Sequence, residues 1–92
     1  WHTMAPRMPG SRVDFVSYRI PPATVLGPTP AHEAGTVEHL HVASGAVRVT
    51  VGDETTDLLA GDSCSCRTDI EHAIENPDTA AEALIYLIVE RA

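Results

Sequence analysis

The sequence predicts an all-β domain of the sandwich or barrel type. Apolar and polar residues alternate with a period of two along most of the 92 residues, which is typical of half-buried strands. Turn-forming residues separate these stretches at short, regular intervals. No segment combines helical length with a helical apolar period. Short strands with this spacing build two-layered or closed β-folds.

The first part of the chain predicts three strands. Val13–Ile20 alternates clearly and ends at a pair of prolines. A short extended piece is expected at Thr24–Leu26, because the four prolines between the first strand and His32 exclude a helix there. Val37–Ala43 is the third strand, and the turn residues Ser44-Gly45 end it.

The second part predicts five more strands, which makes eight. In the first of them three valines alternate with Arg48 and Thr50. Turn signals rich in Gly, Asp, Asn and Pro separate the others. The five expected ranges are Val47–Val51, Glu54–Leu59, Asp62–Arg67, Glu71–Glu75 and Ala83–Glu90.

Composition narrows the possible functions. The formal charge is −7, with six arginines and no lysine, so the domain would repel phosphate backbones and we expect no direct nucleic-acid binding by this segment. The longest apolar run, Ala83–Val89, is too short to cross a membrane. We expect residues 1–11 to form an arm or linker and residues 12–92 to form one domain. Because the chain starts with Trp1 rather than Met, we expect it to be part of a longer protein.

Two histidines and a glutamate are the candidate metal ligands: His32, Glu38 and His72. Imidazole and carboxylate together suit Zn, Fe, Mn or Ni, and three ligands leave positions open for water or a small molecule. His32 and Glu38 are too far apart along an extended chain to share an ion, so we expect a bend at Gly35. We expect His72 to come from a strand paired beside that of Glu38. The alternative is a hydrogen-bonded polar cluster without metal.

Period-two geometry separates these ligands from two nearby histidines. His39 and His41 point away from the face of Glu38, because successive side chains of a strand alternate. We therefore expect them at the surface. Asn76, followed by Pro77, is expected to be a turn residue rather than a ligand.

Cys64 and Cys66 are the only cysteines. Their spacing is poor for a disulfide with each other, so we expect reduced thiols on one strand face, in a cytoplasmic protein. Small apolar filling is their simplest role, and a soft-metal or redox role is the alternative. We expect the ligand pocket to be lined by Leu40, Val42, Cys64, Cys66 and Tyr86.

Two spaced motifs resemble those of the cupin family. In the first motif Gly27, His32, Glu38 and Gly45 match, and Ala34 replaces the family's second histidine. In the second motif Gly61, His72 and Asn76 match, whereas Arg67 and Asp69 replace a proline and a glycine. The resemblance covers residues 12–90. It implies a double-stranded β-helix, or jelly-roll barrel, with a metal site reduced from four ligands to three.

A finer resemblance is to the C-terminal cupin of bacterial regulators that carry a helix-turn-helix of the xenobiotic-response-element type. It rests on His32-x-x-Gly-Thr-x-Glu38 and on the run from Leu58 to Ser63. It implies a sensory domain that binds a small-molecule effector and acts as a homodimer, with its DNA-binding domain outside this segment. The alternatives are a free-standing metal-dependent isomerase or dioxygenase, and a purely structural dimerisation module.

Overall fold

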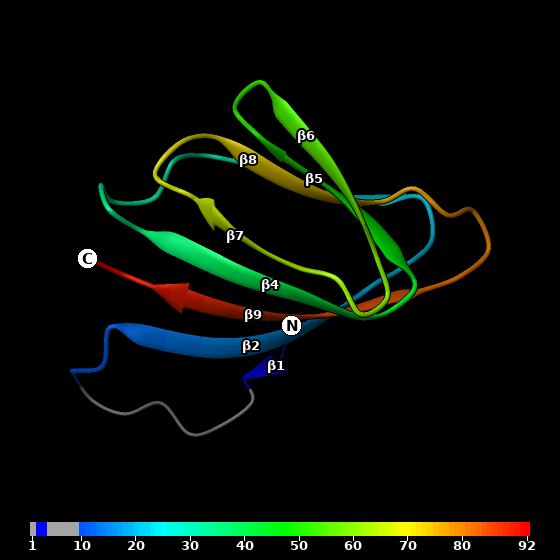
Figure 1. The fold of residues 1–92 in the computed structure, drawn as a ribbon, viewed down its shortest axis with the longest axis horizontal. Helices are drawn as coiled ribbons and strands as arrows, with labels where there is room; N and C mark the ends of the chain where they lie inside the picture. The colour runs from blue at the N-terminus through cyan, green and yellow to red at the C-terminus, as the bar shows by residue number, and fades with distance from the viewer. Residues whose placement is uncertain (1, 4–9) are drawn as a thin grey trace.

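The computed structural model describes residues 2–3 and 10–92, and these form nine strands (Figure 1). The strands are β1 (His2–Thr3), β2 (Val13–Ile20), β3 (Thr24–Thr29), β4 (Val37–Ser44), β5 (Ala46–Val51), β6 (Glu54–Leu59), β7 (Ser63–Arg67), β8 (His72–Asn76) and β9 (Ala83–Glu90). The expected eight strands are all present, with ends that differ by at most a few residues. The described residues include no helix with the length and apolar character needed to cross a membrane.

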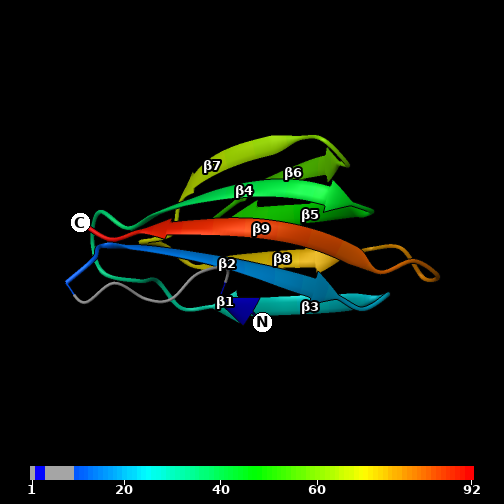
Figure 2. The same cartoon turned by 90° about the horizontal axis from the view of Figure 1, so that it is seen from below.

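Two antiparallel sheets face each other as the two layers of a jelly roll. One has the order β1-β2-β9-β4-β7 and the other the order β3-β8-β5-β6. Figure 2 shows β7 and β6, the last strands of the two sheets, on the same side of the molecule. In both strand orders, neighbouring strands are often distant in sequence. This topology brings residues from distant parts of the chain into the interior between the two sheets.

The core lies between the sheets, where the alternating apolar side chains of both layers meet. On β9, Ala83, Ile85 and Leu87 are buried, whereas Ile88 is exposed. The other buried apolar residues are Val16, Ile20, Leu40, Val42, Val47, Val49, Leu58 and Ile74. Polar residues at the inward-facing positions of a strand therefore also lie between the two sheets.

Two elements differ from the sequence expectation. The strand β3 extends past Leu26 through Gly27-Pro28, with a register shift between Leu26 and Thr29. A proline is tolerated there because β3 is an edge strand. The segment 1–11, expected to be an arm, contributes β1, which pairs with residues 16–17 of β2. Residues 1 and 4–9 lie outside the described part of the chain.

Candidate metal-binding site

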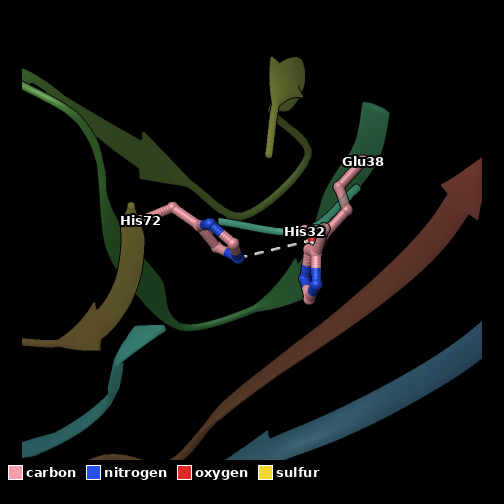
Figure 3. Close-up of side chains that lie close together, drawn as sticks. All are labelled: His32, Glu38 and His72. Atoms are coloured by element: carbon pink, nitrogen blue, oxygen red, sulfur yellow. Dashed lines mark ion pairs between the residues drawn. The ribbon is translucent and has the colours of Figure 1, made fainter. Parts of the chain in front are cut away.

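Three side chains from three segments converge between the sheets (Figure 3). His32 lies in the loop before β4, Glu38 is on β4, and His72 is the first residue of β8. The ligand atoms of the three all lie within 4.8 Å of one another. The structure thus brings together the three residues that the sequence singled out.

His72 reaches the site from the opposite sheet. The expectation that its strand pairs beside β4 is wrong, because β4 and β8 belong to different sheets. Glu38 and His72 instead face each other across the interior. The absence of a side chain at Gly27 matters here, since a Cβ would lie 3.0 Å from the carbonyl oxygen of His72. Glycine at this position lets β3 pack closely beside the start of β8.

The separations between the donor atoms fit a shared ion better than mutual hydrogen bonds. Glu38 Oε2 lies 3.3 Å from His32 Nε2 and 3.5 Å from His72 Nε2. Charge-assisted hydrogen bonds are shorter, about 2.7–2.9 Å. Ligands about 2.0–2.2 Å from a tetrahedral ion are separated from each other by roughly 3.4 Å. The donor set and its spacing therefore suit a divalent transition metal.

The ring of His72 is oriented for this role. Its Nδ1–H donates to the carbonyl oxygen of Ile70, at 2.8 Å, and because a carbonyl only accepts, this bond fixes the proton on Nδ1 in the neutral ring. Nε2 then presents its lone pair toward Glu38. A lone pair facing a carboxylate is repulsive unless a proton or a metal cation lies between them. A backbone carbonyl is also the usual partner for the second nitrogen of a metal-bound histidine.

The loop that carries His32 is anchored to the segment before β8. The His32 amide donates to the Thr68 carbonyl at 2.8 Å, and the Thr68 amide donates to the Thr36 carbonyl at 3.0 Å. Asp69 Oδ2 accepts a hydrogen bond from the Gly35 amide at 3.0 Å. Gly35 has a φ of 85°, a conformation that favours glycine, and it supplies the expected bend between His32 and Glu38.

Asp69 is itself held by a charged neighbour. Both of its carboxylate oxygens accept hydrogen bonds from the Arg67 guanidinium, at 3.1 and 3.0 Å. These bonds, with that from the Gly35 amide, lower the pKa of Asp69. The two residues that depart from the second cupin motif thus form a pair that supports the His32 loop.

Burial differs among the three candidate ligands. The side chains of Glu38 and His72 are 10% and 8% exposed, whereas that of His32 is 43% exposed. Beside the first two lies a small cavity of about 20 Å³ that Thr68 also lines. The hydroxyl of Thr68 is buried and has no hydrogen-bond partner among the described residues. The site therefore combines a buried polar floor with one ligand at its mouth.

Two further hollows border the site: the smaller is lined by all three residues, and the larger by His32 and Glu38. One of about 160 Å³ reaches between the sheets, and one of about 450 Å³ lies toward β2 and β9. Tyr18 and Leu87 line both, and Leu26 lines the inner one. These pocket residues were not predicted from the sequence, although Tyr18 is in phase with the inward residues Val16 and Ile20 and is predictable from that alternation.

The residues expected to line one pocket are spread over several hollows, and Leu40, Cys64 and Tyr86 line one of about 580 Å³ beside His39 and His41. Leu40 and Val42 are buried in the core next to Glu38 on the inward face of β4. Cys64 and Cys66 face inward from β7 and border a groove, and Cys66 also lines the small cavity beside Glu38 and His72. Tyr86 alternates with the buried Ile85 and Leu87. Tyr86 therefore faces away from the interior, where Tyr18 and Leu87 line the hollow beside the three candidate ligands.

The outer face of the five-stranded sheet holds Tyr86 and both remaining histidines of β4. The Tyr86 ring packs edge-on against Phe15, with ring centroids 6.3 Å apart. His39 Nδ1 lies 2.7 Å from Ser65 Oγ, and His41 Nδ1 lies 2.7 Å from Ser63 Oγ. The expectation that these histidines point away from the site is confirmed.

Asn76 has a structural role, as expected. Its side chain is fully buried, and its Nδ2 lies 2.8–3.2 Å from the carbonyl oxygens of Ile20, Pro21 and Ala81. Its Oδ1 accepts a hydrogen bond from the Asp78 amide. One side chain thus ties the end of β2 to the turn between β8 and β9.

Comparisons with known proteins agree on the fold. A family model described as Cupin domain matches residues 16–89. The structure resembles the Cupin_2 domain of an XRE family transcriptional regulator from Enterobacter cloacae, with a TM-score of 0.88 and 21% identity, covering 98% of this chain and 93% of that one. It also resembles an HTH_3 family transcriptional regulator from Vibrio cholerae, with a TM-score of 0.86 and 19% identity.

The second of these chains is longer than the present one. The match covers 99% of this chain but only 49% of the Vibrio cholerae regulator. A Cupin 2 conserved barrel domain protein from Salinispora arenicola matches with a TM-score of 0.76 and 17% identity, over 99% of this chain and 74% of that one. A comparison with curated protein sequences gives no match. At these identities the similarity establishes the jelly-roll fold.

Proposed function

The chain belongs to the cupin domain family, and we propose that it is the effector-sensing domain of a bacterial transcriptional regulator. The observation that carries the proposal is the convergence of His32, Glu38 and His72 at the mouth of an interior hollow. The structural similarity to the Cupin_2 domain of the Enterobacter cloacae regulator, over nearly the full length of both, supports the proposal that this domain is part of a regulator. The DNA-binding part would lie outside this segment.

The three converging residues would hold one divalent ion, Zn, Fe, Mn or Ni. A bound ion would supply open coordination positions to which an oxygen or nitrogen of the effector binds. His72 is set in the required orientation by the Ile70 carbonyl, and Glu38 supplies the negative charge between the two rings. His32, in the loop at the mouth, is the ligand best placed to respond to an incoming molecule, because it is the least buried of the three.

The hollows limit the effector to a small molecule. Their volumes of about 160 and 450 Å³ are in the range of, or below, ordinary ligand pockets. Apolar walls from Leu26, Ile74 and Leu87 meet the polar ligands and Tyr18. We therefore propose a compact effector with an apolar body and one metal-binding polar group.

The acidic charge is consistent with a domain that binds an effector while another domain binds DNA. A domain with a formal charge of −7 is repelled by DNA, so operator contacts belong to another part of the protein. We propose a cytoplasmic homodimer, since bacterial operators and their regulators are commonly two-fold symmetric. The exposed apolar side chains Phe15 and Ile88, with Tyr86, give the second copy a surface on the outer face of the five-stranded sheet.

The gene and the full-length protein test this proposal. The DNA upstream of the Trp1 codon should encode a helix-turn-helix, and an upstream sequence without one contradicts the regulator assignment. In the full-length protein, removing metal with a chelator should change operator binding in the wild type but not in Glu38→Gln. If operator binding still responds to an effector-containing extract after chelator treatment and in Glu38→Gln, the role of the metal is contradicted. The assignment as a regulator domain is then unaffected.

The donor set also supports one alternative. Two histidines and one carboxylate with open positions are the ligand set of many non-haem iron oxygenases. A metal-dependent enzyme of the dioxygenase or isomerase type is therefore the second candidate. Iron-dependent oxygen consumption, or turnover of a small substrate, that is lost in Glu38→Gln would favour it over the sensor.

A further inference from the structure

A pair of thiols faces a groove on the open side of the jelly roll. Cys64 and Cys66 lie on β7, the last strand of its sheet, and their Sγ atoms are 3.6 Å apart. Both are free and half-buried. Their strand partners on β4 are Leu40 and Glu38. The two sulfurs thus project from the inward face of an edge strand, and Cys66 also lines the small cavity beside Glu38 and His72.

The groove is large enough to admit solvent and a small ligand. It has a volume of about 600 Å³ and is lined by residues of β7, β5 and β6. Figure 2 shows β7 and β6, the edge strands of the two sheets, on the same side of the molecule. Val49, Val51 and Thr56 line the far wall, and Arg67 and Ile70 lie at its border. Both sulfurs pack against the core on one side and border this open hollow on the other.

The sulfur separation suits chelation of a soft cation. In a tetrahedral site with sulfur about 2.3 Å from the ion, two thiolates lie roughly 3.8 Å apart. The observed 3.6 Å is close to this separation, so both sulfurs could bind one ion with little movement of β7. A disulfide is a different case, because it requires the sulfurs to approach to about 2.05 Å.

We propose that Cys64 and Cys66 form a second ion site, which chelates a soft divalent cation of the Zn²⁺ and Cd²⁺ kind through two thiolates and leaves its other positions facing the groove. The binding step releases both thiol protons to solvent as the two sulfur–metal bonds form. No electron transfer is involved. The site uses a different set of ligands from the proposed function, since neither sulfur belongs to the His32–Glu38–His72 cluster.

The environment of the thiols also distinguishes chelation from nucleophilic chemistry. Burial, followed by the hydrogen bond with Cys66, raises the pKa of Cys64 to about 12. A nucleophilic cysteine requires a lowered pKa instead. Ion binding has to displace the protons, so the affinity should increase as the pH rises.

Titration with Cd²⁺ tests the proposal, because thiolate ligation gives an ultraviolet charge-transfer band that nitrogen and oxygen ligands do not give. The wild type should show this band with a saturation point at about one thiolate-bound Cd²⁺ per chain and a release of about two protons per ion. Zn²⁺ should compete for the site and remove the band. Cys64→Ser and Cys66→Ser should each weaken the band-forming site at least 10-fold.

His32→Ala is the matched control for the other site, because His32 lines neither the groove of the thiols nor the small cavity that Cys66 shares with Glu38. It should leave the thiolate band unchanged while it lowers binding at the histidine cluster, so the failure of one proposal is distinguishable from that of the other. If a serine variant does not fold by circular dichroism, Cys64→Ala and Cys66→Ala, which keep an apolar side chain, replace it. A wild-type protein that folds but shows no thiolate band at saturating Cd²⁺, or a band unaffected by either substitution, overturns the proposal.

Discussion

The carboxylate of Asp69 accepts a hydrogen bond from the backbone amide of Gly35, at 3.0 Å, across 34 positions of sequence. This bond joins the segment before β8, which leads to His72, to the loop that carries His32. Asp69 therefore helps to position His32 relative to His72, although Asp69 is not itself a candidate ligand. The precision of the site depends on this support as much as on the ligands themselves.

Replacing Asp69 should weaken metal binding without removing a ligand. In Asp69→Asn the acceptor for Gly35 and the partner of Arg67 are weakened, so His32 is less well held. We expect an affinity for Zn²⁺ about 10–100-fold lower, as for other residues that support metal ligands, measured by competition with a chromophoric chelator. Asp57→Asn is the control, because Asp57 pairs with Arg48 on the opposite sheet. An equal loss in both variants contradicts this role.

The same residue predicts a pH dependence of stability. Hydrogen bonds from Arg67 and from the Gly35 amide lower the pKa of Asp69 in the folded protein. The contribution of Asp69 to the free energy of unfolding is therefore fully present above the pKa of about 4 that it has in the unfolded chain. This contribution is lost as the pH falls through the lower pKa of the folded protein. The difference in free energy of unfolding between wild type and Asp69→Asn should shrink below about pH 4. Urea unfolding at a series of pH values measures it, and a constant difference contradicts the prediction.

Asn76 should be important for stability but not for metal binding. Its buried amide faces three carbonyl oxygens and one backbone amide. Asn76→Ala leaves these groups without their partner, so we expect a loss of roughly 3 kcal/mol in the free energy of unfolding. Asn76→Asp keeps the acceptor for Asp78 but turns a carboxylate toward the carbonyls, and should be at least as harmful at neutral pH. A loss below about 1 kcal/mol in both contradicts this account.

The proposed dimer predicts that a charge on the outer sheet face separates the copies. Phe15 and Ile88 are 43% and 37% exposed on that face. Phe15→Asp should raise the dimer dissociation constant about 10-fold or more, followed by light scattering over a range of concentrations. Val25→Asp is the control, since Val25 is as exposed but lies on β3 of the other sheet. A wild type that is monomeric at high concentration contradicts the dimer.

Period-two alternation predicted much of this architecture from sequence. It located the strands and separated Glu38, which faces inward, from His39 and His41, which face outward. It could not predict the sheet from which His72 arrives, because alternation defines the face of a strand and not its partner. Strand pairing in this fold joins elements distant in sequence.

Other features escaped prediction for identifiable reasons. The stretch Ala83–Glu90 is almost continuously apolar, so the sequence does not show which of its residues face inward, and Tyr86, expected in the pocket, alternates with the buried Ile85 and Leu87. The motif departures at Arg67 and Asp69 carried no sign of their role, since the contact with Gly35 exists only once the chain has folded. The expected bend at Gly35 and the turn role of Asn76, in contrast, follow from local backbone preferences.

Elemental analysis measures whether His32, Glu38 and His72 together bind one divalent ion. The protein is purified without chelator, loaded with a limited excess of Zn²⁺ and desalted, with Cys64→Ser/Cys66→Ser as the background so that thiol binding does not contribute. We predict about one ion per chain, lost in His72→Ala and Glu38→Gln and retained in the surface variant His41→Ala. A metal content far below one per chain, or one that His72→Ala leaves unchanged, would contradict the proposed metal site.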